Sequence, residues 1–507
     1  MPVLENLPVE IVEEIASWIE NDLKKLRLVS KHLNQAAQRV LWATHALVVD
    51  FGPGSWIKVP NHGRKCVLDI IKFNAVFIML RELENRSPSC NLIQRLVFKV
   101  GPWASLSPDC SDEAGKFMHR ELPGLLPGAL SSLQGLVSAR VEVVTGFDPD
   151  WLYELLFGPL AVLPLLRELT VDDLSYYSPK QRIALPLHLF NHGKLKKLSI
   201  GDRYQHGDEF VPSVTKILAQ NPEITHLKLD NYAVIGAQNI DLRVLFRNVD
   251  VRSLHLQHLH IHGWFVDFSA PEILPHIRSL RGLELASHHE NYPSALKTLR
   301  NHDIYLRKLR YHTVTDELVT YLESYMGLEE LSLPYTGYLE HDERAGSFYC
   351  STLYGHRDSL RELHVASVYE PTWIIGLHNV GVFDSYEKLV SLSVGLKLDD
   401  INPGLNEGDV IATLLMRLVR LPTFRRLRFT KVERKGERTM GSYGTSWSEL
   451  EDCMESRIKS ALQSARFELA PPSLWREVEV FTPADVAFES YRAHEHETQA
   501  LQFRPRP

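Results

Sequence analysis

Apolar and polar residues alternate in short runs along most of the chain. The pattern apolar-x-x-apolar-x-apolar returns twelve times, beginning with IQRLVF and ending with FRRLRF. Side chains of a strand point alternately to its two faces, so each copy predicts a short strand with one buried face. The copies occupy residues 93–98, 136–141, 166–171, 195–200, 224–229, 251–256, 280–285, 306–311, 328–333, 360–365, 389–394 and 424–429.

Between the copies, apolar residues recur with helical spacing. In VPSVTKILAQN (211–221) and DVIATLLMRLVRL (409–421) they fall at i, i+3, i+4 and i+7. A strand with one apolar face cannot bury it alone, so neighbouring copies must stack around a shared core. The alternation of strand and helix therefore predicts an α/β solenoid, with parallel strands on its concave face and helices on its convex face.

The L-x-x-L-x-L core of the copies resembles the leucine-rich-repeat family over residues 91–433, with about twelve repeats. The family consensus has Asn or Cys at the ninth position, where the side chain satisfies turning backbone. This chain has other residues there, such as Leu174 and Tyr232. We therefore expect an irregular solenoid, with long insertions around 101–132, 175–190 and 337–357.

The first forty residues follow a different pattern. Ile11 and Ile15 lie one helical turn apart after Pro8, which fits the first turn of a helix. Asp22 and Ser30 can cap a second and a third helix. Units below roughly 40 residues usually need metals, disulfides or a partner to be stable. This segment is therefore predicted to be a docking module whose stability is completed by another protein.

The motifs LP-x-EI, DL-x2-LRLVSK and a closing LW resemble the F-box over residues 4–42. F-box modules bind the Skp-type adaptor of SCF (Skp, cullin, F-box) ubiquitin ligases, and through it a cullin scaffold. The stretch WIEND (18–22) is one residue shorter than the usual turn, and whether this weakens adaptor binding stays open. By the resemblance, the adaptor interface would contain Leu7, Pro8, Ile11, Ile15, Leu26, Val29, Ser30 and Leu33.

Composition narrows the class of partner. The formal charge is 56 − 63 = −7, which gives no overall basic surface for nucleic acid. No apolar run approaches the roughly 18 residues that span a membrane, and the first ten residues lack a signal segment. The five cysteines are widely scattered, which fits reduced thiols. These features favour cytoplasm or nucleus, without a membrane, nucleic acid or cofactor.

The predicted strands also predict a binding face. If the fourth and sixth positions of each copy point to the core, the third, fifth and seventh point to the concave side. These positions are polar and rich in histidine, and we expect them to hold an unidentified protein substrate; the alternative is a solvated strand face without a ligand. The candidate substrate-binding residues are His226, Lys228, Asp230, His255, Gln257, Lys308, Arg310 and His312.

Two other signals have alternative interpretations. The stretch HLQHLHIHGW contains four histidines, which could bind a metal with Asp267 or the run 288–290, but polar alternation along a strand explains them as well. The basic cluster RRLRFTKVERKGER (425–438) could be a nuclear signal, but most of it lies on the last repeat and its outgoing loop. We therefore predict no metal site.

The remaining segments complete the domain organisation. Residues 43–90 are expected to connect the F-box to the repeats, 434–448 to form a loop, 449–490 to cap the array and 491–507 to be a disordered tail. No nucleophile or phosphate-binding motif is present, so no catalytic residue is predicted. The combination predicts the substrate-recognition subunit of an SCF-type ubiquitin ligase. The alternative is a non-catalytic leucine-rich-repeat scaffold without ligase function.

Overall fold

The computed structural model describes most of the repeat region but not the first 46 residues. The predicted F-box (4–42), with all eight candidate adaptor contacts, therefore lies outside the described residues. The described residues are 47–50, 55–59, 63–67, 78–85, 88–100, 120–143, 150–173, 186–190, 193–202, 210–231, 240–247, 249, 254–286, 292, 294–312, 314–336, 344–367, 373–405, 408–432, 446–468, 477–495 and 498–506.

The chain divides into two compact units, of which the first comprises residues 1–265 and 270–279. Its main sheet is parallel, in the order β1-β4-β5-β6-β7-β8-β10. The strands of this sheet are β1 (Leu47–Asp50), β4 (Arg95–Val100), β5 (Ser138–Val143), β6 (Glu168–Asp173), β7 (Lys197–Asp202), β8 (His226–Asn231) and β10 (His258–His262).

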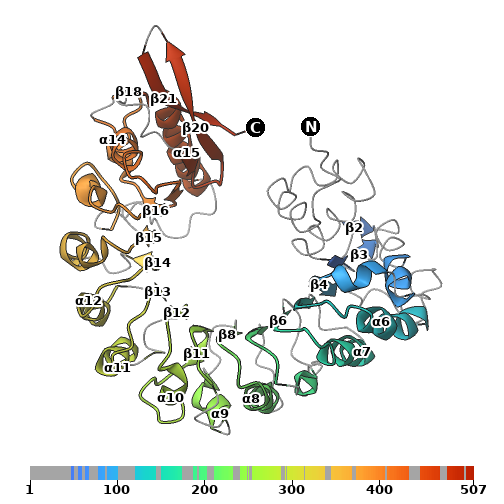
Figure 1. Ribbon diagram of the computed structural model, residues 1–507. Helices are drawn as coiled ribbons and strands as arrows, with labels where there is room; N and C mark the ends of the chain where they lie inside the picture. Colours follow the sequence, from blue (N-terminus) through green and yellow to red (C-terminus); the bar gives the residue numbers. More distant parts are fainter. Residues whose placement is uncertain are drawn as a thin grey trace, which may run out of the picture. The chain divides into compact units, whose positions relative to one another are not determined.

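Helices connect the strands of the first unit and lie on one side of the sheet (Figure 1). A separate antiparallel hairpin and a two-stranded parallel pair complete this unit. The connecting helices are η3 (Pro88–Leu92), α6 (Leu122–Ser131), α7 (Asp150–Ala161), η7 (Leu187–Leu189), α8 (Phe210–Gln220), α9 (Arg243–Phe246) and α10 (Leu274–Ile277). The small pairings are β2 (Ser55–Val59) with β3 (Gly63–Val67), and β9 (Ile240–Asp241) with β11 (Trp264–Phe265).

The second unit comprises residues 266–269 and 280–507. Its sheet is parallel from β12 through β17 to β19, and antiparallel from β19 through β20 and β21 to β18. The strands are β12 (Gly282–Leu285), β13 (Lys308–Tyr311), β14 (Glu330–Thr336), β15 (Glu362–Ser367), β16 (Ser391–Gly395), β17 (Arg426–Thr430), β18 (Phe467–Glu468), β19 (Glu479–Phe481), β20 (Ala487–Glu495) and β21 (Thr498–Pro505).

Helices again line one side of the parallel strands in this unit (Figure 1). The prediction of a helix over 409–421 is confirmed, and Asp409 caps it by accepting a hydrogen bond of 3.0 Å from the Ile411 N–H. The helices are α11 (Ala295–Asn301), α12 (Asp316–Glu323), α13 (Arg344–Ser347), η9 (Phe348–Thr352), η10 (Leu353–His356), η11 (Val380–Phe383), η12 (Leu398–Asp400), α14 (Val410–Leu418) and α15 (Ser446–Ser464).

The core of each unit lies between its parallel strands and the connecting helices. The fourth and sixth positions of the repeat are buried, for example Leu169 and Val171 on β6 or Leu363 and Val365 on β15. The first position is buried as well, at Leu166 in one unit and at Leu360 in the other. The prediction of an α/β array of parallel strands, like that of leucine-rich repeats, is therefore confirmed for the described repeats.

Buried polar side chains take the place of the missing asparagine ladder. Asn221 accepts a hydrogen bond from the Leu195 N–H at 3.2 Å, and the Tyr321 hydroxyl accepts one from the Leu306 N–H at 3.1 Å. His356 Nδ1 accepts from the Leu328 N–H at 3.3 Å. Each of these three leucines is the first residue of a repeat copy. The side chains therefore satisfy the same backbone group, because a buried N–H without a partner is costly.

The sixth strand differs from the sequence prediction. We expected it at 251–256, but the strand that pairs with β8 is β10, which aligns His258 with His226 and Leu259 with Leu227. The backbone at the start of β10 has the same register, because the N–H groups of Gln257 and His258 both donate to the Thr225 carbonyl. His255 and Gln257 therefore precede the strand, and the prediction that they lie on its open side is wrong.

Both ends of the described array also differ from expectation. Within the segment expected to connect the F-box to the repeats, β1 extends the sheet by pairing with β4. At the other end, residues 491–507 were expected to be a disordered tail, but β20 and β21 pair through eight aligned positions from Phe488 and Pro505 to Glu495 and Thr498. β20 pairs with the edge of β19, and Phe488 on β20 and Phe503 on β21 are buried.

Candidate functional site

The side of each sheet that faces away from its helices is called the open face here. On the first unit, the strand register places its residues in three rows across β5, β6, β7, β8 and β10. The first row is Ser138, Glu168, Lys197, His226 and His258; the middle row is Arg140, Thr170, Ser199, Lys228 and His260; the last row is Glu142, Asp172, Gly201, Asp230 and His262.

Carboxylates of the last row pair with cations of neighbouring positions. Arg140 lies 3.0 Å from Glu142 and 2.9 Å from Asp172, and Lys99 on β4 lies 3.3 Å from Glu142. Burial raises the pKa of Asp172, and the nearby Arg140 and Lys228 charges oppose this rise. This part of the face is a linked set of ion pairs in which each charge already has a partner.

Asp230 forms the most buried of these contacts. It is 3% exposed and receives hydrogen bonds from His260 Nε2 at 2.5 Å and from the Lys228 ammonium at 2.9 Å. Burial alone favours the neutral acid, but the hydrogen bonds and charges of His260 and Lys228 outweigh it and lower the pKa of Asp230 to about 2. An ionised carboxylate only accepts hydrogen bonds, so His260 is the donor in this pair.

Two histidines stack beside this contact. The rings of His226 and His258 lie 4.3 Å apart with an interplanar angle of 20°. Burial, followed by the nearby His258 and Lys197, lowers the pKa of His226 to about 4, although Glu168 opposes this. His226 is therefore neutral near pH 7. A neutral imidazole both donates and accepts a hydrogen bond, and His226 Nδ1 already lies 2.9 Å from the Thr225 hydroxyl.

The structure brings together some of the predicted site residues and separates others. His226, Lys228 and Asp230 lie on β8, beside His258 and His260 of β10. The prediction missed His258 and His260 because it used the copy VRSLHL; the overlapping copy LQHLHI (256–261) fits the same pattern and has the observed register. His255 is exposed and Gln257 half-buried, just before β10.

The other predicted residues belong to the second unit. Lys308 and Arg310 lie on the open face of β13, and His312 follows that strand. The Lys308 ammonium lies 2.5 Å from Glu330 on β14. Arg310 is exposed. The eight predicted residues are therefore divided between the two units, and only His226, Lys228, Asp230, Lys308 and Arg310 lie on strands.

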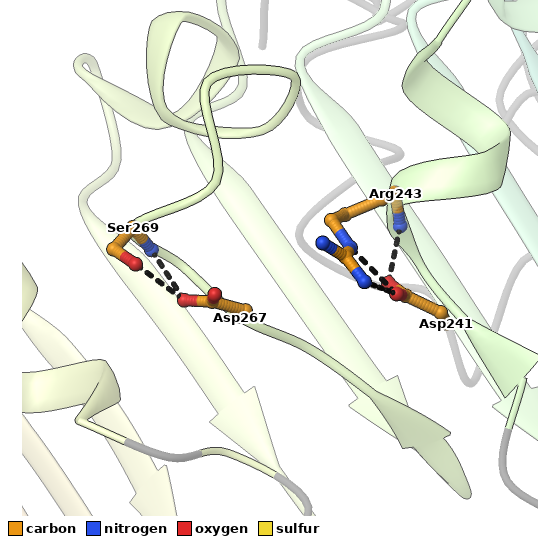
Figure 2. Close-up of polar contacts among 4 residues, drawn as sticks. All are labelled: Asp241, Arg243, Asp267 and Ser269. Atoms are coloured by element: carbon orange, nitrogen blue, oxygen red, sulfur yellow. Dashed lines mark hydrogen bonds and ion pairs between the residues drawn. The ribbon is translucent and has the colours of Figure 1, made fainter.

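Acidic side chains near the histidine-rich segment form local contacts. Asp267 Oδ1 accepts hydrogen bonds from the N–H of Ser269 at 3.0 Å and from its hydroxyl at 2.6 Å, as Figure 2 shows. Figure 2 also shows Asp241, which accepts from the backbone N–H of Arg243 at 2.9 Å and from its Nε at 2.6 Å. In the described part of the chain, no group of three His, Cys, Asp or Glu side chains is arranged to hold a metal ion.

Comparison with protein families and with curated protein sequences finds no match. Among solved structures, the chain is similar to one in the crystal structure of the TLR13–ssRNA13 complex, with 14% identity and a TM-score of 0.30. The match covers 69% of this chain and 49% of that chain, so this chain spans about half the length of the matched protein. Within the described ranges, every helix is too short or too polar to cross a membrane.

Proposed function

We propose that this protein is the substrate-recognition subunit of an SCF-type ubiquitin ligase. In this proposal, residues 4–42 bind a Skp-type adaptor, and the adaptor connects the chain to a cullin scaffold. The open faces of the repeat array hold a client protein. The observation that carries the proposal is the F-box-like segment at the start of a chain whose described remainder is a repeat array with polar, uncovered strand faces.

The proposed role requires no catalytic residue in this chain. Ubiquitin passes from the cysteine of a conjugating enzyme to a lysine of the client. The receptor accelerates this transfer by raising the effective concentration of the client near the enzyme and by limiting its orientations. On the first unit, the stacked His226 and His258 and the exposed Glu168–Lys197 pair, 2.6 Å apart, offer polar contacts to a client.

Adaptor binding is tested with a double variant of the F-box-like segment. The substitutions Leu7→Ala and Pro8→Ala should reduce co-purification of a Skp-type adaptor at least about ten-fold, because they remove apolar surface at the proposed interface. The matched control is Val162→Ala with Leu165→Ala, two apolar residues that are 73% and 48% exposed on the first unit. An adaptor that never binds the unaltered chain, or binds both variants equally, contradicts the proposal.

Client binding is tested separately from adaptor binding. Replacing Glu168, Lys197 and His258 by alanine should remove a set of proximity-labelled proteins while the adaptor is retained. After proteasome inhibition, those proteins should carry ubiquitin only when the F-box-like segment is intact. The alternative function, a scaffold without ubiquitin transfer, predicts that the same proteins are labelled but not ubiquitinated.

A further inference from the structure

The open face of the second unit has a middle row that crosses five parallel strands. The strand register aligns Arg310 with Ser332, Ser332 with His364, His364 with Ser393, and Ser393 with Arg428. The row therefore has a guanidinium at each end and two hydroxyls and an imidazole between them. Every side chain in it can donate a hydrogen bond, and none is a carboxylate.

The two arginines differ in how firmly they are held. Arg310 is exposed, and its register continues to Glu284 on the next strand, β12. Arg428 pairs with Asp485, whose side chain is 71% exposed, and lies over the Phe481 ring, 4.9 Å from its centre. An exposed pair of this kind contributes little free energy, about 0–1 kcal/mol, so another carboxylate can replace Asp485.

The first unit has a similar middle row, but carboxylates of that unit neutralise its cations. There the middle row runs Arg140, Thr170, Ser199 and Lys228, again with cations around hydroxyls. The last row of that face supplies Glu142, Asp172 and Asp230 as partners. In the second unit, the residues two positions after Ser332, His364, Ser393 and Arg428 are Pro334, Ala366, Gly395 and Thr430. The row of the second unit therefore has no carboxylate at these four positions, whereas Glu330 and Glu362 lie two positions before Ser332 and His364.

The centre of the row also has unused hydrogen-bonding capacity. Ser393 is 7% exposed and its Oγ has no hydrogen-bond partner among the described residues, which is costly for a buried hydroxyl. Burial, with the charges of Arg310 and Arg428, lowers the pKa of His364. This imidazole is therefore neutral near pH 7 and adds no positive charge between the arginines.

We propose that this row, Arg310-Ser332-His364-Ser393-Arg428, binds an extended acidic segment of a client protein. The inference rests on the proposed function and adds the chemical class of the client. Four strand spacings of about 4.8 Å separate the two arginine backbones by roughly 19 Å. An extended peptide advances about 3.3 Å per residue, so two carboxylates about six residues apart reach both guanidinium groups. The segment runs across the strands, and its carboxylates form charge-assisted hydrogen bonds with the arginines.

The test measures peptide binding by the purified full chain, without adaptor. The probe is a fluorescent peptide of about twelve residues with two glutamates about six positions apart in a Ser/Gly background, measured by anisotropy. It should bind at least about ten-fold more tightly than its glutamine counterpart, because each charge-assisted hydrogen bond is worth more than about 1.4 kcal/mol. A peptide with adjacent glutamates should bind more weakly, because it reaches one arginine only.

The variant Arg310→Gln with Arg428→Gln should lower the affinity for the acidic peptide about ten-fold or more. The matched control is Arg307→Gln with Arg425→Gln, which makes the same change in net charge at the second repeat position, outside the row. Equal losses in both variants would show a general charge effect and overturn the proposal, as would equal affinity for the glutamate and glutamine peptides. Adaptor co-purification is measured independently, so failure of the ligase proposal is distinguishable from failure of this site.

Discussion

Asp230 shows how one buried carboxylate depends on residues of two neighbouring strands. Lys228 lies on the same strand and His260 on the next, and both donate to it. The folded pKa of about 2 lies below the ordinary value of 3.8, so this carboxylate stabilises the fold at pH values above about 4. That contribution is lost as the pH falls through 2, where the folded form also takes up a proton.

The substitution Asp230→Asn should therefore destabilise the first unit at pH 7. The pKa shift corresponds to a loss on the order of 2 kcal/mol in the free energy of unfolding. Urea unfolding of both proteins between pH 7 and pH 2 measures the difference, which should shrink as the pH falls below about 4. As a control, Asp241→Asn removes a more exposed pair with Arg243 and should cost less than about 1 kcal/mol. A loss for Asp230→Asn that does not change with pH contradicts this account.

At the scale of elements, the sequence predicts the regular repeats well. Each of their strands begins two residues after the start of its predicted copy, because an apolar residue at the fourth position and another at the sixth fit only one face of a strand. The helices over 211–221 and 409–421 follow from helical spacing for the same reason. Alternate burial on the strands also predicts which side chains can reach a ligand.

The displaced strand β10 shows where this reasoning fails. The two overlapping copies, at 251–256 and 256–261, satisfy the same apolar pattern, and Leu254, Leu256, Leu259 and Ile261 are all buried. Pattern alone cannot distinguish them; the backbone pairing with Thr225 does. The candidate site followed the wrong register, so it named His255 and Gln257 in place of His258 and His260.

The register of β10 predicts effects of different size for substitutions of two nearby histidines. His260→Ala removes a hydrogen-bond donor from the buried Asp230 and should cost about 1–3 kcal/mol. His255→Ala changes an exposed side chain and should alter the free energy of unfolding by less than about 0.5 kcal/mol. Urea unfolding of the two variants measures both effects. Equal effects, or a larger effect for His255, would show that the strand has the register of the copy at 251–256.

The carboxy-terminal hairpin lacked a clear sequence signal. Its segment AHEHETQALQFRPRP is mostly polar, and the described buried positions of β21 are Ala500, Leu501 and Phe503. A capping strand needs only one partly apolar face, because its backbone hydrogen bonds come from pairing with β20. Low hydrophobicity was therefore a poor indicator of disorder in this segment.

This hairpin predicts a large effect for an aromatic residue close to the end of the chain. Phe503 is 3% exposed and packs edge-to-face against Phe467, with ring centres 6.4 Å apart. Phe503→Ala should destabilise the second unit by about 3–5 kcal/mol, as other buried phenylalanines do. Arg504→Gln, which removes a surface pair with Glu489 at 2.7 Å, serves as the control and should cost less than about 1 kcal/mol. Thermal unfolding that is unchanged by Phe503→Ala would indicate a free tail.

At the scale of the whole molecule, the two repeat units carry different open faces. The first face satisfies most of its charges internally, through contacts such as Arg140 with Asp172. On the second, Arg310 is exposed and Arg428 is weakly held. Acidic ligands should therefore bind to the second unit. Ligands of the first unit should be held mainly by its histidines and neutral polar side chains.

The most direct test is a comparison of ubiquitinated proteins captured by three forms of the chain after proteasome inhibition. The unaltered chain should capture a Skp-type adaptor and a set of ubiquitinated clients. Leu7→Ala with Pro8→Ala should retain the clients without their ubiquitin, whereas Arg310→Gln with Arg428→Gln should retain the adaptor and lose clients with acidic segments. Clients whose ubiquitination is the same with and without an intact F-box-like segment would contradict the proposed function.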